Sequence, residues 1–353
     1  MNPFSVTILR WYAECGRDLP WRRTQDPYAV WLSEIILQQT RIAQGTAYWQ
    51  RFLDRFPTVE SLAHASEDEV LRLWEGLGYY SRARNLHAAA RQIVALGGFP
   101  RTLEGLRGLK GVGDYTAAAV GSICFGLPAA VVDGNVYRVL ARHFGLETPV
   151  GTPEAKKEFT ALAQRLLPPE EPAAFNQGLM DFGALQCTPQ NPDCLLCPLQ
   201  GTCNAFRTGR VGLLPVKKSA AKPVERHLTY VYVRFEGQTA IRRRGPGDIW
   251  QGLWEPLTDA PSPSGVSPSG DPSSPGAPQD DIRLLRSGVR HQLTHRTLLA
   301  DFYLWEPTER PSLPEGYVWI QEAELDRYAK SRLFELLIAE ILRFAQNDKP
   351  LSS

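Results

Sequence analysis

Four cysteines crowd into one short segment, and this segment constrains the fold more than any other part of the chain. Cys187, Cys194, Cys197 and Cys203 are separated by six, two and five residues. The central Cys-Leu-Leu-Cys pair lets two thiolates reach one centre from a single turn, and the outer cysteines close the coordination from two short loops. Four soft sulfur ligands suit an iron-sulfur cluster or zinc. Disulfide pairing is the alternative that the spacing leaves open.

The composition is that of a globular protein. The chain has 353 residues, of which 43% are hydrophobic and 22% charged, so it is long enough for two ordinary cores. The first residues lack a basic stretch before an apolar one, which argues against a secretory signal and favours a reducing compartment. The apolar stretch from Tyr115 to Val132 is interrupted by Gly121, Gly126 and Pro128. It therefore predicts a buried helix and a turn rather than a membrane span.

Positive charge is local, although the net charge is only +1. The stretch from Arg82 to Lys110 has six basic residues and one acidic residue, and so does the stretch from Arg207 to Arg226. Either run can line a phosphate backbone. The alternative is a solvated helix face in the first case and a solubilising linker in the second.

The spacing of apolar residues divides the chain into two domains. Residues 1–205 have helical periodicity that glycine and proline interrupt at short intervals, which predicts an all-helical domain. Residues 206–226 are expected to form a basic linker. The following domain, 227–345, is expected to be α+β, with a disordered insertion rich in Pro and Ser at 260–279 and a short tail at 346–353. Its predicted strands are 227–235, 239–243 and 298–305, and its predicted helix is 331–344.

A glycine turn lies between two apolar helical segments. Gly111 and Gly113 permit a tight approach of the backbone, and the N–H groups that open the next helix point outward at the positive end of its dipole. Lys110 adds a cation, so this turn has the parts of a phosphate site. Such a turn alone is more often structural. The helix-hairpin-helix pattern and the Val-Asp-Gly-Asn-Val segment that begins at Val132 favour a DNA-binding role.

The hairpin, the downstream aspartate and the cysteine spacing together resemble the endonuclease III superfamily of base-excision DNA glycosylases. Three further motifs, at residues 33–40, 76–86 and 175–177, are similar to those of the MutY-type adenine DNA glycosylases. The resemblance implies a [4Fe-4S] cluster on Cys187, Cys194, Cys197 and Cys203. It also implies a mainly α helix-hairpin-helix glycosylase domain with a six-helix lobe at about 21–130, a cluster lobe from 1–20 and 131–205, and a Nudix-like C-terminal domain.

Cleavage of the bond between adenine and deoxyribose needs an acid for the leaving base and an anion near the developing positive charge on the sugar. Glu34 lies among apolar residues of a predicted helix, which favours the acid role because an apolar setting raises a carboxyl pKa. The resemblance implies that Asp133 stabilises the sugar cation, with Asn135 and Tyr115 in support. Without the resemblance, Asp133 is simply a helix N-cap and Glu34 a carboxylate on a helix surface.

The resemblance also implies an enzyme that leaves an abasic site without cutting the strand. Superfamily members that cut the strand carry a lysine in the second hairpin helix, where this chain has Tyr115. Some adenine glycosylases have a lysine four residues after the catalytic aspartate, where this chain has Tyr137. Neither position can form a Schiff base, so we expect a monofunctional glycosylase.

The enzyme must flip the adenine out of the duplex and fill the gap that it leaves. By resemblance, Gln39 and Tyr79 wedge into the duplex, and Leu37 and Gln177 line the adenine pocket. Core packing is the alternative for the apolar and aromatic members of this set. The residues implied in binding DNA or the flipped base are Trp21, Arg22, Leu37, Gln39, Thr40, Leu77, Tyr79, Lys110, Gly111, Gly113 and Gln177.

The C-terminal domain contains a segment similar to the Phe-Ser-His motif by which the family recognises 8-oxoguanine. Leu293 and Thr294 replace the Phe and Ser, and His295 keeps the imidazole. The hydroxyl of Thr294 preserves a lesion contact, whereas Leu293 lacks the aromatic ring. The glutamate-rich metal box of Nudix hydrolases is missing after Trp250, so no pyrophosphohydrolase activity is expected.

The expected substrate is double-stranded DNA with adenine opposite 8-oxoguanine or guanine, and the expected protein is a monomer of the bacterial cytoplasm and nucleoid without membrane contact. Two alternatives stand beside this interpretation. One is a thymine-glycol or mismatch-thymine glycosylase of the same superfamily, which a lysine at position 115 or the absence of the second domain would favour; this chain has neither feature. The other is a DNA-bound iron-sulfur or zinc protein that senses redox state.

Overall fold

The computed structural model describes residues 1–218, 223–258 and 282–347. The insertion predicted at 260–279 lies outside the described residues, as does the predicted tail after Asn347. Within the described part of the chain, no helix combines the length and the apolar character that crossing a membrane requires.

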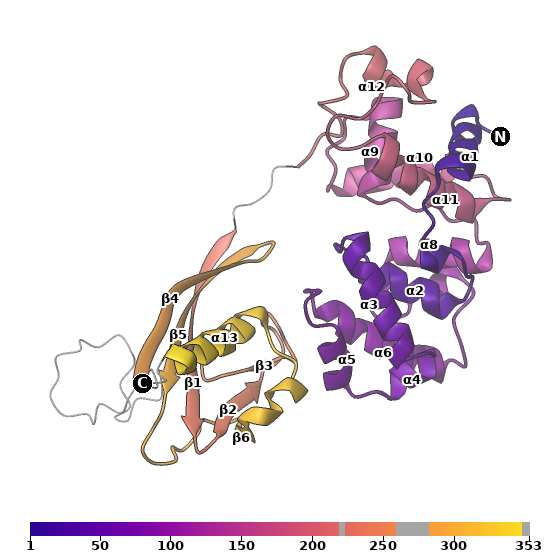
Figure 1. Cartoon of the computed structure of the whole chain (residues 1–353). Coiled ribbons are helices and arrows are strands. Elements are labelled where there is room, and N and C mark those ends of the chain that lie inside the picture. The colour runs from indigo at the N-terminus through magenta and orange to yellow at the C-terminus, as the bar shows by residue number, and fades with distance from the viewer. Residues whose placement is uncertain (219–222, 259–281, 348–353) are drawn as a thin grey trace. The chain divides into compact units, whose positions relative to one another are not determined.

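The chain forms two compact units (Figure 1). Unit 1 comprises Met1–His64 and Asn85–Ala220, and unit 2 comprises Ala65–Arg84 and Ala221–Ser353. Unit 1 is helical, and unit 2 contains a sheet and helices. These findings confirm the predicted fold class, an all-helical part combined with an α+β part. Helix α6 (Ser81–Ala95) runs across the boundary between the units.

Proline and a polar capping residue set the start of several helices in unit 1. Asp26 accepts hydrogen bonds from the backbone of Tyr28 and Ala29, and Pro27 follows it as the first residue of α2. The helices of unit 1 are α1 (Pro3–Cys15), α2 (Pro27–Ile36), α3 (Ile42–Arg55), α4 (Val59–His64), α7 (Leu103–Arg107), α8 (Asp114–Phe125), α9 (Gly134–Phe144), α10 (Pro153–Leu166), α11 (Pro172–Asp181) and α12 (Asn204–Arg207), with short turns η1 (Pro20–Arg22), η2 (Phe182–Gln186) and η3 (Gln200–Thr202).

Helix α8 holds unit 1 together, because it packs against α2, α7 and α11. Its middle residues are buried, and Gly126 ends it in the left-handed conformation. The buried helix and turn predicted for the apolar stretch at 115–132 are thus confirmed. Helix α1 packs against α11, and one apolar core joins these elements to α9 and α10. Its largest buried members include Phe4, Ile8, Leu140, Phe159, Phe175, Leu179 and Phe182.

Part of the segment predicted as a linker returns to unit 1. After α12 the chain runs beside the loop before α10, where Val150 N donates to Val216 O at 2.8 Å. The buried guanidinium of Arg142 on α9 donates from Nε to Leu214 O at 3.0 Å. Residues up to Lys218 are therefore part of the helical unit.

Unit 2 is built on a six-stranded sheet in the order β3-β2-β1-β5-β4, with β6 also pairing with β2. Strands β1 and β2 form the predicted hairpin, whose turn contains Glu236 and Gly237 at positive φ, as this tight turn requires. The predicted strand at 298–305 is the greater part of β5, which pairs in parallel with β1. The strands are β1 (Val224–Phe235), β2 (Gln238–Arg243), β3 (Trp254–Glu255), β4 (Ile282–Gln292), β5 (Arg296–Trp305) and β6 (Tyr317–Gln321).

Alternate side chains of β1 enter two different cores. Tyr230 and Tyr232 join the core beneath α13 (Arg332–Asn347), whereas Val231 and Val233 join a smaller core on the other face. Unit 2 also contains α5 (Glu67–Leu73) and η4 (Glu322–Arg327).

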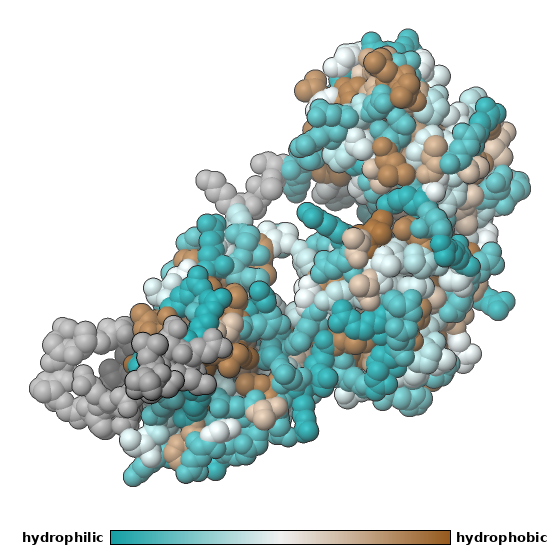
Figure 2. Space-filling view, viewed as in Figure 1, coloured by the Kyte–Doolittle hydropathy of each residue, from teal (hydrophilic) through white to brown (hydrophobic). Residues whose placement is uncertain are grey.

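Exposed apolar side chains gather in the cysteine-rich part of unit 1. Leu195 and Leu196, between the two central cysteines, are each 78% exposed, and Leu213 is 70% exposed. Figure 2 shows brown apolar surface over the end of unit 1 that carries α12.

Candidate active site

The glycine turn before α8 has a conformation that suits glycine. Gly111 has a φ of 75°, and a Cβ at this position would lie 2.6 Å from the Cβ of Asn85. Gly113 caps α8 without a side-chain hydrogen bond, so side chains do not occupy the first N–H groups of the helix. The side chain of Lys110 beside them is exposed. The turn therefore presents backbone donors and a cation together, as predicted for a phosphate site.

Asp114, the first residue of α8, forms ion pairs with two basic side chains near this turn. Its carboxylate accepts a hydrogen bond from Lys156 Nζ at 2.7 Å and lies 2.9 Å from Arg107 Nε. The hydrogen bond from Lys156 is the main cause that lowers the pKa of Asp114. The ammonium group of Lys156 is thus held in an ion pair on the surface.

Glu34 and Tyr115 bring α2 and α8 together at the candidate site. Glu34 is half-buried in α2, and the Tyr115 hydroxyl, which donates to Met180 Sδ at 3.5 Å, affects its pKa. Burial raises the pKa of Glu34 to about 7, while Tyr115 and the charge of Arg22 act in the opposite direction. The same burial raises the pKa of Tyr115, so this hydroxyl keeps its proton. Glu34 can therefore hold or release a proton near neutral pH.

Asp133 caps α9 and is held by its own helix. One carboxylate oxygen accepts from Val136 N at 2.8 Å, and the other accepts from Asn135 Nδ2 at 2.8 Å. Burial raises the pKa of Asp133, and these hydrogen bonds oppose that effect. Asn135 is itself fixed, because Arg138 Nη2 donates to its Oδ1 at 2.8 Å. The negative charge on Asp133 is thus held in one place by three neighbouring groups.

Both carboxylates line one cavity of about 780 Å³ in unit 1. The predicted residues that it brings together are Glu34, Leu37, Gln39, Gly111, Gly113, Tyr115 and Asp133. Its other lining residues are Gln38, Asp114, Thr116, Ala130, Val132, Gly134, Tyr137, Lys156 and Thr160. Glu34 and Asp133 are far apart in the sequence, but the fold brings both side chains to the same cavity.

Other predicted residues lie outside the lining of this cavity. Trp21 is buried against Trp49, with ring centroids 5.8 Å apart. Arg22 is not a lining residue, but its charge acts on Glu34. Gln177 is buried in α11, where its Oε1 accepts a hydrogen bond from the Tyr12 hydroxyl at 2.5 Å. Lys110, Thr40 and Asn135 also lie outside the lining.

Three residues that support the site were not predicted from the sequence. Tyr12 holds Gln177, Arg138 holds Asn135, and Asp181 holds Arg22 through hydrogen bonds of 2.6 and 2.8 Å. Arg138 also donates from Nε to Cys187 O at 2.7 Å, which ties α9 to the first cysteine. The only signal in the sequence was the presence of charged residues within otherwise apolar helices.

The remaining predicted contacts lie in unit 2. Leu77 is buried, whereas Tyr79 is 44% exposed and has a positive φ of 47°. The hydroxyl groups of Tyr79 and Thr294 share a hydrogen bond. Thr294 and His295 lie in the exposed turn between β4 and β5, which Leu293 N closes by donating to Arg296 O at 2.8 Å. The predicted wedge residue and the predicted lesion contact are thus neighbours within one unit.

The four cysteines have free thiols and are half-buried in unit 1. Three of them, Cys187, Cys197 and Cys203, pack against the core of that unit. Burial, together with the charges of the neighbouring thiols, raises the pKa of Cys197 to about 11 and also raises that of Cys194. Arg142 Nη1 lies 3.4 Å from Cys187 Sγ. Among the described residues, no group of three or more His, Cys, Asp or Glu side chains is arranged to hold a metal ion.

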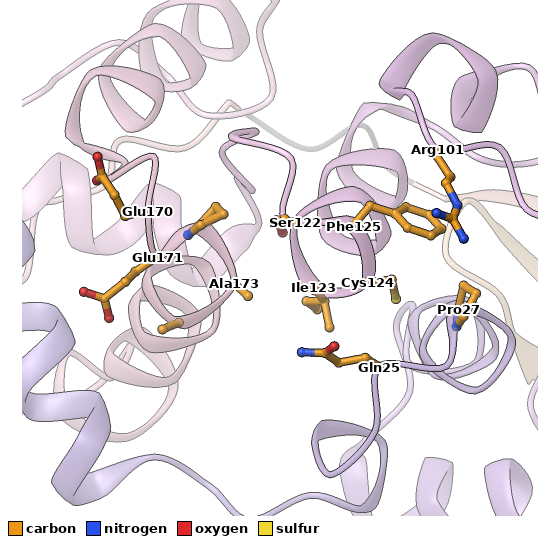
Figure 3. Close-up of a pocket in the computed structure, with 13 residues that line it drawn as sticks. Gln25, Pro27, Arg101, Ser122, Ile123, Cys124, Phe125, Glu170, Glu171 and Ala173 are labelled. Carbon is orange, nitrogen blue, oxygen red and sulfur yellow. The ribbon is translucent and has the colours of Figure 1, made fainter.

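A second cavity of about 780 Å³ lies at the C-terminal end of α8 (Figure 3). Cys124, Phe125 and Arg101 line one side of it, and Glu170 and Glu171 line the other. The guanidinium of Arg101 lies 5.8 Å from the ring centroid of Phe125. None of the predicted site residues lines this cavity, which is separate from the one that contains Glu34 and Asp133.

Comparison with known families matches both parts of the chain. Residues 32–169 match the HhH-GPD superfamily of base excision DNA repair proteins, and residues 229–340 match the NUDIX domain. A solved structure of a thermostable thymine-DNA glycosylase is 33% identical, with a TM-score of 0.53, over 58% of this chain and 95% of that one. A non-covalent endonuclease III–DNA complex is 23% identical, with a TM-score of 0.50, over 58% of this chain and 94% of that one, and supports the fold alone.

Two curated relatives narrow the family of this chain within the HhH-GPD superfamily. The adenine DNA glycosylase of Homo sapiens is 46% identical over 58% of this chain, and this chain spans 40% of that protein's length. The adenine DNA glycosylase of Buchnera aphidicola subsp. Schizaphis graminum is 36% identical over 71% of this chain and 73% of its own length. The chain, with its Glu34–Asp133 cavity and its two matched domains, therefore belongs to the adenine DNA glycosylase family.

Proposed function

We propose that this protein removes adenine from DNA in which adenine stands opposite 8-oxoguanine or guanine, and that it leaves an abasic site. The observation that carries the proposal is the single cavity shared by Glu34 and Asp133 beside the glycine hairpin. Two carboxyl groups in one site can divide the work of cleaving an N-glycosidic bond, one as the acid and the other as the anion. Membership of the adenine DNA glycosylase family supports adenine as the base.

Glu34 is the acid in this mechanism. Its pKa of about 7 keeps a proton on a large fraction of molecules at neutral pH, as an acid catalyst requires. It gives this proton to the flipped adenine, which can then leave as a neutral base. Burial raises the pKa of the Tyr115 hydroxyl, so this hydroxyl keeps its own proton beside the acid.

Asp133 is the anion that stabilises the sugar. As the C–N bond breaks, positive charge develops on the deoxyribose ring, and a carboxylate in a partly buried site stabilises that charge strongly. Val136 N and Asn135 Nδ2 favour the ionised form of Asp133 by donating to it. Water then adds to C1′ of the sugar and gives its proton to the Glu34 carboxylate, which restores the acid and completes the hydrolysis.

Strand cutting by this superfamily needs a lysine amine that attacks the sugar, and this cavity lacks a lysine at the two expected positions. Tyr115 and Tyr137 line it at the positions where related enzymes carry lysine. Among the lining residues, Lys156 alone has an amine, and its pKa is raised, mainly by the hydrogen bond to Asp114. The ammonium group of Lys156 is held by Asp114, so we expect the product to remain an intact strand.

The four cysteines would hold a [4Fe-4S] cluster. Their chemistry fits such a cluster, because four free thiols in one short segment can supply four thiolate ligands. Their charges act on one another, and three of them pack on one core. When bound, such a cluster links the loops between residues 187 and 203 covalently. The chain's own part is to hold these loops, through Arg142, which donates to Thr188 O at 2.7 Å and Pro189 O at 3.1 Å.

Contacts to DNA are assigned to both units. In unit 1, the N–H groups at the start of α8 and Lys110 bind a phosphate. Gln39, exposed and with a positive φ of 57°, is presented toward the duplex. In unit 2, Tyr79 enters the base stack, and Thr294 and His295 contact the 8-oxoguanine. Backbone contacts position the protein, and these few side chains select the lesion.

One assay tests substrate and reaction together. A duplex with a single adenine opposite 8-oxoguanine, labelled on the adenine strand, is incubated with the protein and then analysed with and without hot alkali. The proposal predicts strand breakage only after alkali, and no breakage when thymine replaces the adenine. Breakage without alkali would contradict the monofunctional reaction, and intact strands in both arms would contradict base removal.

A further inference from the structure

One face of α10 reaches the cavity that contains Glu34 and Asp133. Lys156 and Thr160 are four residues apart on this helix, so they lie on the same face, and both line the cavity. Lys157, the next residue, is exposed as well but is not part of the lining. Helix α10 therefore places one lysine at the cavity and one away from it.

The charged groups that line this cavity are mostly acidic. Among its described lining residues, the charged side chains are Lys156 and the carboxyl groups of Glu34, Asp114 and Asp133. A phosphate group that comes near ionised carboxyl groups is repelled unless a cation offsets their charge. Lys156 is therefore the side chain of this lining that suits a phosphate.

The ion pair that holds Lys156 is open to exchange. Lys156 Nζ donates to Asp114 Oδ2 at 2.7 Å, and the two side chains are 65% and 56% exposed. Exposed ion pairs of this kind contribute little to stability, so a phosphate can take the place of the carboxylate. Asp114 stays paired after such an exchange, because Arg107 Nε lies 2.9 Å from its other carboxylate oxygen.

A nucleotide that enters this cavity brings its phosphate groups to the rim. In the proposed reaction the base reaches Glu34 and the sugar reaches Asp133, and the sugar carries a phosphate on each side. We propose that Lys156 exchanges Asp114 for a phosphate next to the flipped adenine and so helps to hold this nucleotide in the cavity. This inference rests on the proposed function. The ammonium group is paired with an anion before and after the exchange, in agreement with a reaction that leaves the strand intact.

A purely structural role for the ion pair makes a different prediction. In that case Lys156→Gln and Asp114→Asn remove the same link between α10 and α8, and both change DNA binding in the same direction. Under the proposal, Lys156→Gln removes a phosphate contact and weakens binding. Asp114→Asn removes the anion that competes with the phosphate, and therefore strengthens binding.

Binding is measured with the full chain and a duplex that carries 2′-fluoro-2′-deoxyadenosine opposite 8-oxoguanine. The fluorine destabilises positive charge on the sugar, so the duplex is bound but not cleaved. Lys156→Gln is expected to weaken binding about 10-fold and to reduce the slope of log Kd against log salt by about 0.9, as the loss of one phosphate contact requires. Asp114→Asn is expected to strengthen binding about threefold.

The neighbouring lysine provides a matched control. Lys157→Gln removes the same charge from the next position of α10, away from the cavity lining, and is expected to change Kd less than about twofold. Lys156→Arg keeps the positive charge at the cavity and is expected to keep the salt dependence of the wild type. Both lysines are exposed, so none of these substitutions disturbs the core.

An uncharged methylphosphonate locates the contact on the DNA. It replaces, one at a time, the phosphates on the two sides of the fluorinated adenosine. At one of these positions we expect the replacement to weaken binding about 10-fold for the wild type and for Lys157→Gln. For Lys156→Gln we expect a loss below about twofold at the same position, because this variant has no contact left to lose.

Two results overturn the proposal. One is that each methylphosphonate changes binding by the same factor for the wild type and for Lys156→Gln. The other is that Lys156→Gln and Asp114→Asn change the affinity in the same direction. If the expected pattern is found but the unmodified duplex releases no adenine, the phosphate contact stands and the proposed function alone fails.

Discussion

Glu34 and Asp133 are the same kind of group in two different settings. Burial is the main cause that raises the pKa of each. Asp133 has two hydrogen bonds at 2.8 Å that hold it ionised, from Val136 N and Asn135 Nδ2. For Glu34, burial outweighs the opposing effects of Tyr115 and Arg22, and its pKa reaches about 7. Under the proposed mechanism, these settings separate the acid, Glu34, from the anion, Asp133, within one cavity.

The two carboxylates could be predicted from the sequence, but the residues that support the site around them could not. Glu34, Tyr115 and Asp133 lie within the sequence motifs that resemble those of the family. Asp181 and Tyr12 stand in no such motif, and their partners are far away in the chain, with Tyr12 and Gln177 separated by 165 positions. Such pairs form only when α1 packs against α11. The local patterns in a single sequence do not show which helices pack together.

The buried carboxyl of Glu34 should make stability depend on pH. Its folded pKa of about 7 lies above its ordinary value of 4.5, so the folded state binds this proton more tightly than the unfolded chain. The resulting stability is full below pH 4.5 and is lost as the pH rises through about 7. Glu34→Gln removes the free-energy cost of burying an ionised carboxylate, which the wild-type protein bears at higher pH.

We therefore expect Glu34→Gln to raise the melting temperature relative to wild type more at pH 8 than at pH 5. The exposed Glu158 on α10 is the matched control, and Glu158→Gln should give the same small difference at both values. Thermal unfolding by circular dichroism measures all three proteins. An advantage of Glu34→Gln that is equal at pH 5 and pH 8 would contradict the raised pKa.

At the scale of elements, the start of α8 is where the sequence was most informative. Two glycines one residue apart predicted a tight turn, and Gly111 does take a positive φ. Strand β4 was not predicted, because most of its side chains are exposed and it has no regular apolar alternation. Its pairing with β5 also contains two register shifts, which disturb any period of two.

Gly111→Ala is expected to destabilise the hairpin and weaken DNA binding. The added Cβ meets Asn85 at 2.6 Å, and a φ of 75° is unfavourable for alanine, so a loss of roughly 1–3 kcal/mol in the free energy of unfolding is expected. Gly113→Ala is the control for folding, because it has no positive φ and a Cβ there meets nothing within 4 Å. Urea unfolding measures both variants, and equal stability for the two would contradict this reading of the turn.

At the scale of the whole molecule, the compact units are held together by contacts between residues that are far apart in the sequence. Residues 65–84 join unit 2 through pairs such as Lys330 N, which donates to Glu75 Oε1 at 2.7 Å, and Arg243 Nη2, which lies 2.9 Å from Glu67 Oε1. The fold class was predictable because periodicity and turn residues are local. The partners of residues 65–84 were not, since the contacts that place this segment span more than 170 positions.

The cysteine segment packs on the core of unit 1, and none of its cysteines lines the cavity of the two proposed catalytic carboxylates. We expect Cys197→Ser to lower the iron content, the melting temperature and the affinity for duplex DNA, because its thiol packs on the same core as α9. Cys15→Ser is the matched control, since Cys15 is exposed at the end of α1. Iron analysis, thermal unfolding and a binding titration measure these effects. A Cys197→Ser protein with wild-type stability and DNA affinity would contradict a structural cluster.

The most direct test of the central claim is the rate of adenine release by Glu34→Gln in a single-turnover assay on a duplex with adenine opposite 8-oxoguanine. Gln has nearly the same shape as Glu but cannot give a proton to the base. If Glu34 is the acid, release should fall at least about 100-fold, because general acid catalysis contributes factors of this size, while the variant still binds the duplex. Adenine release at the wild-type rate by a folded, DNA-binding Glu34→Gln protein would contradict the account.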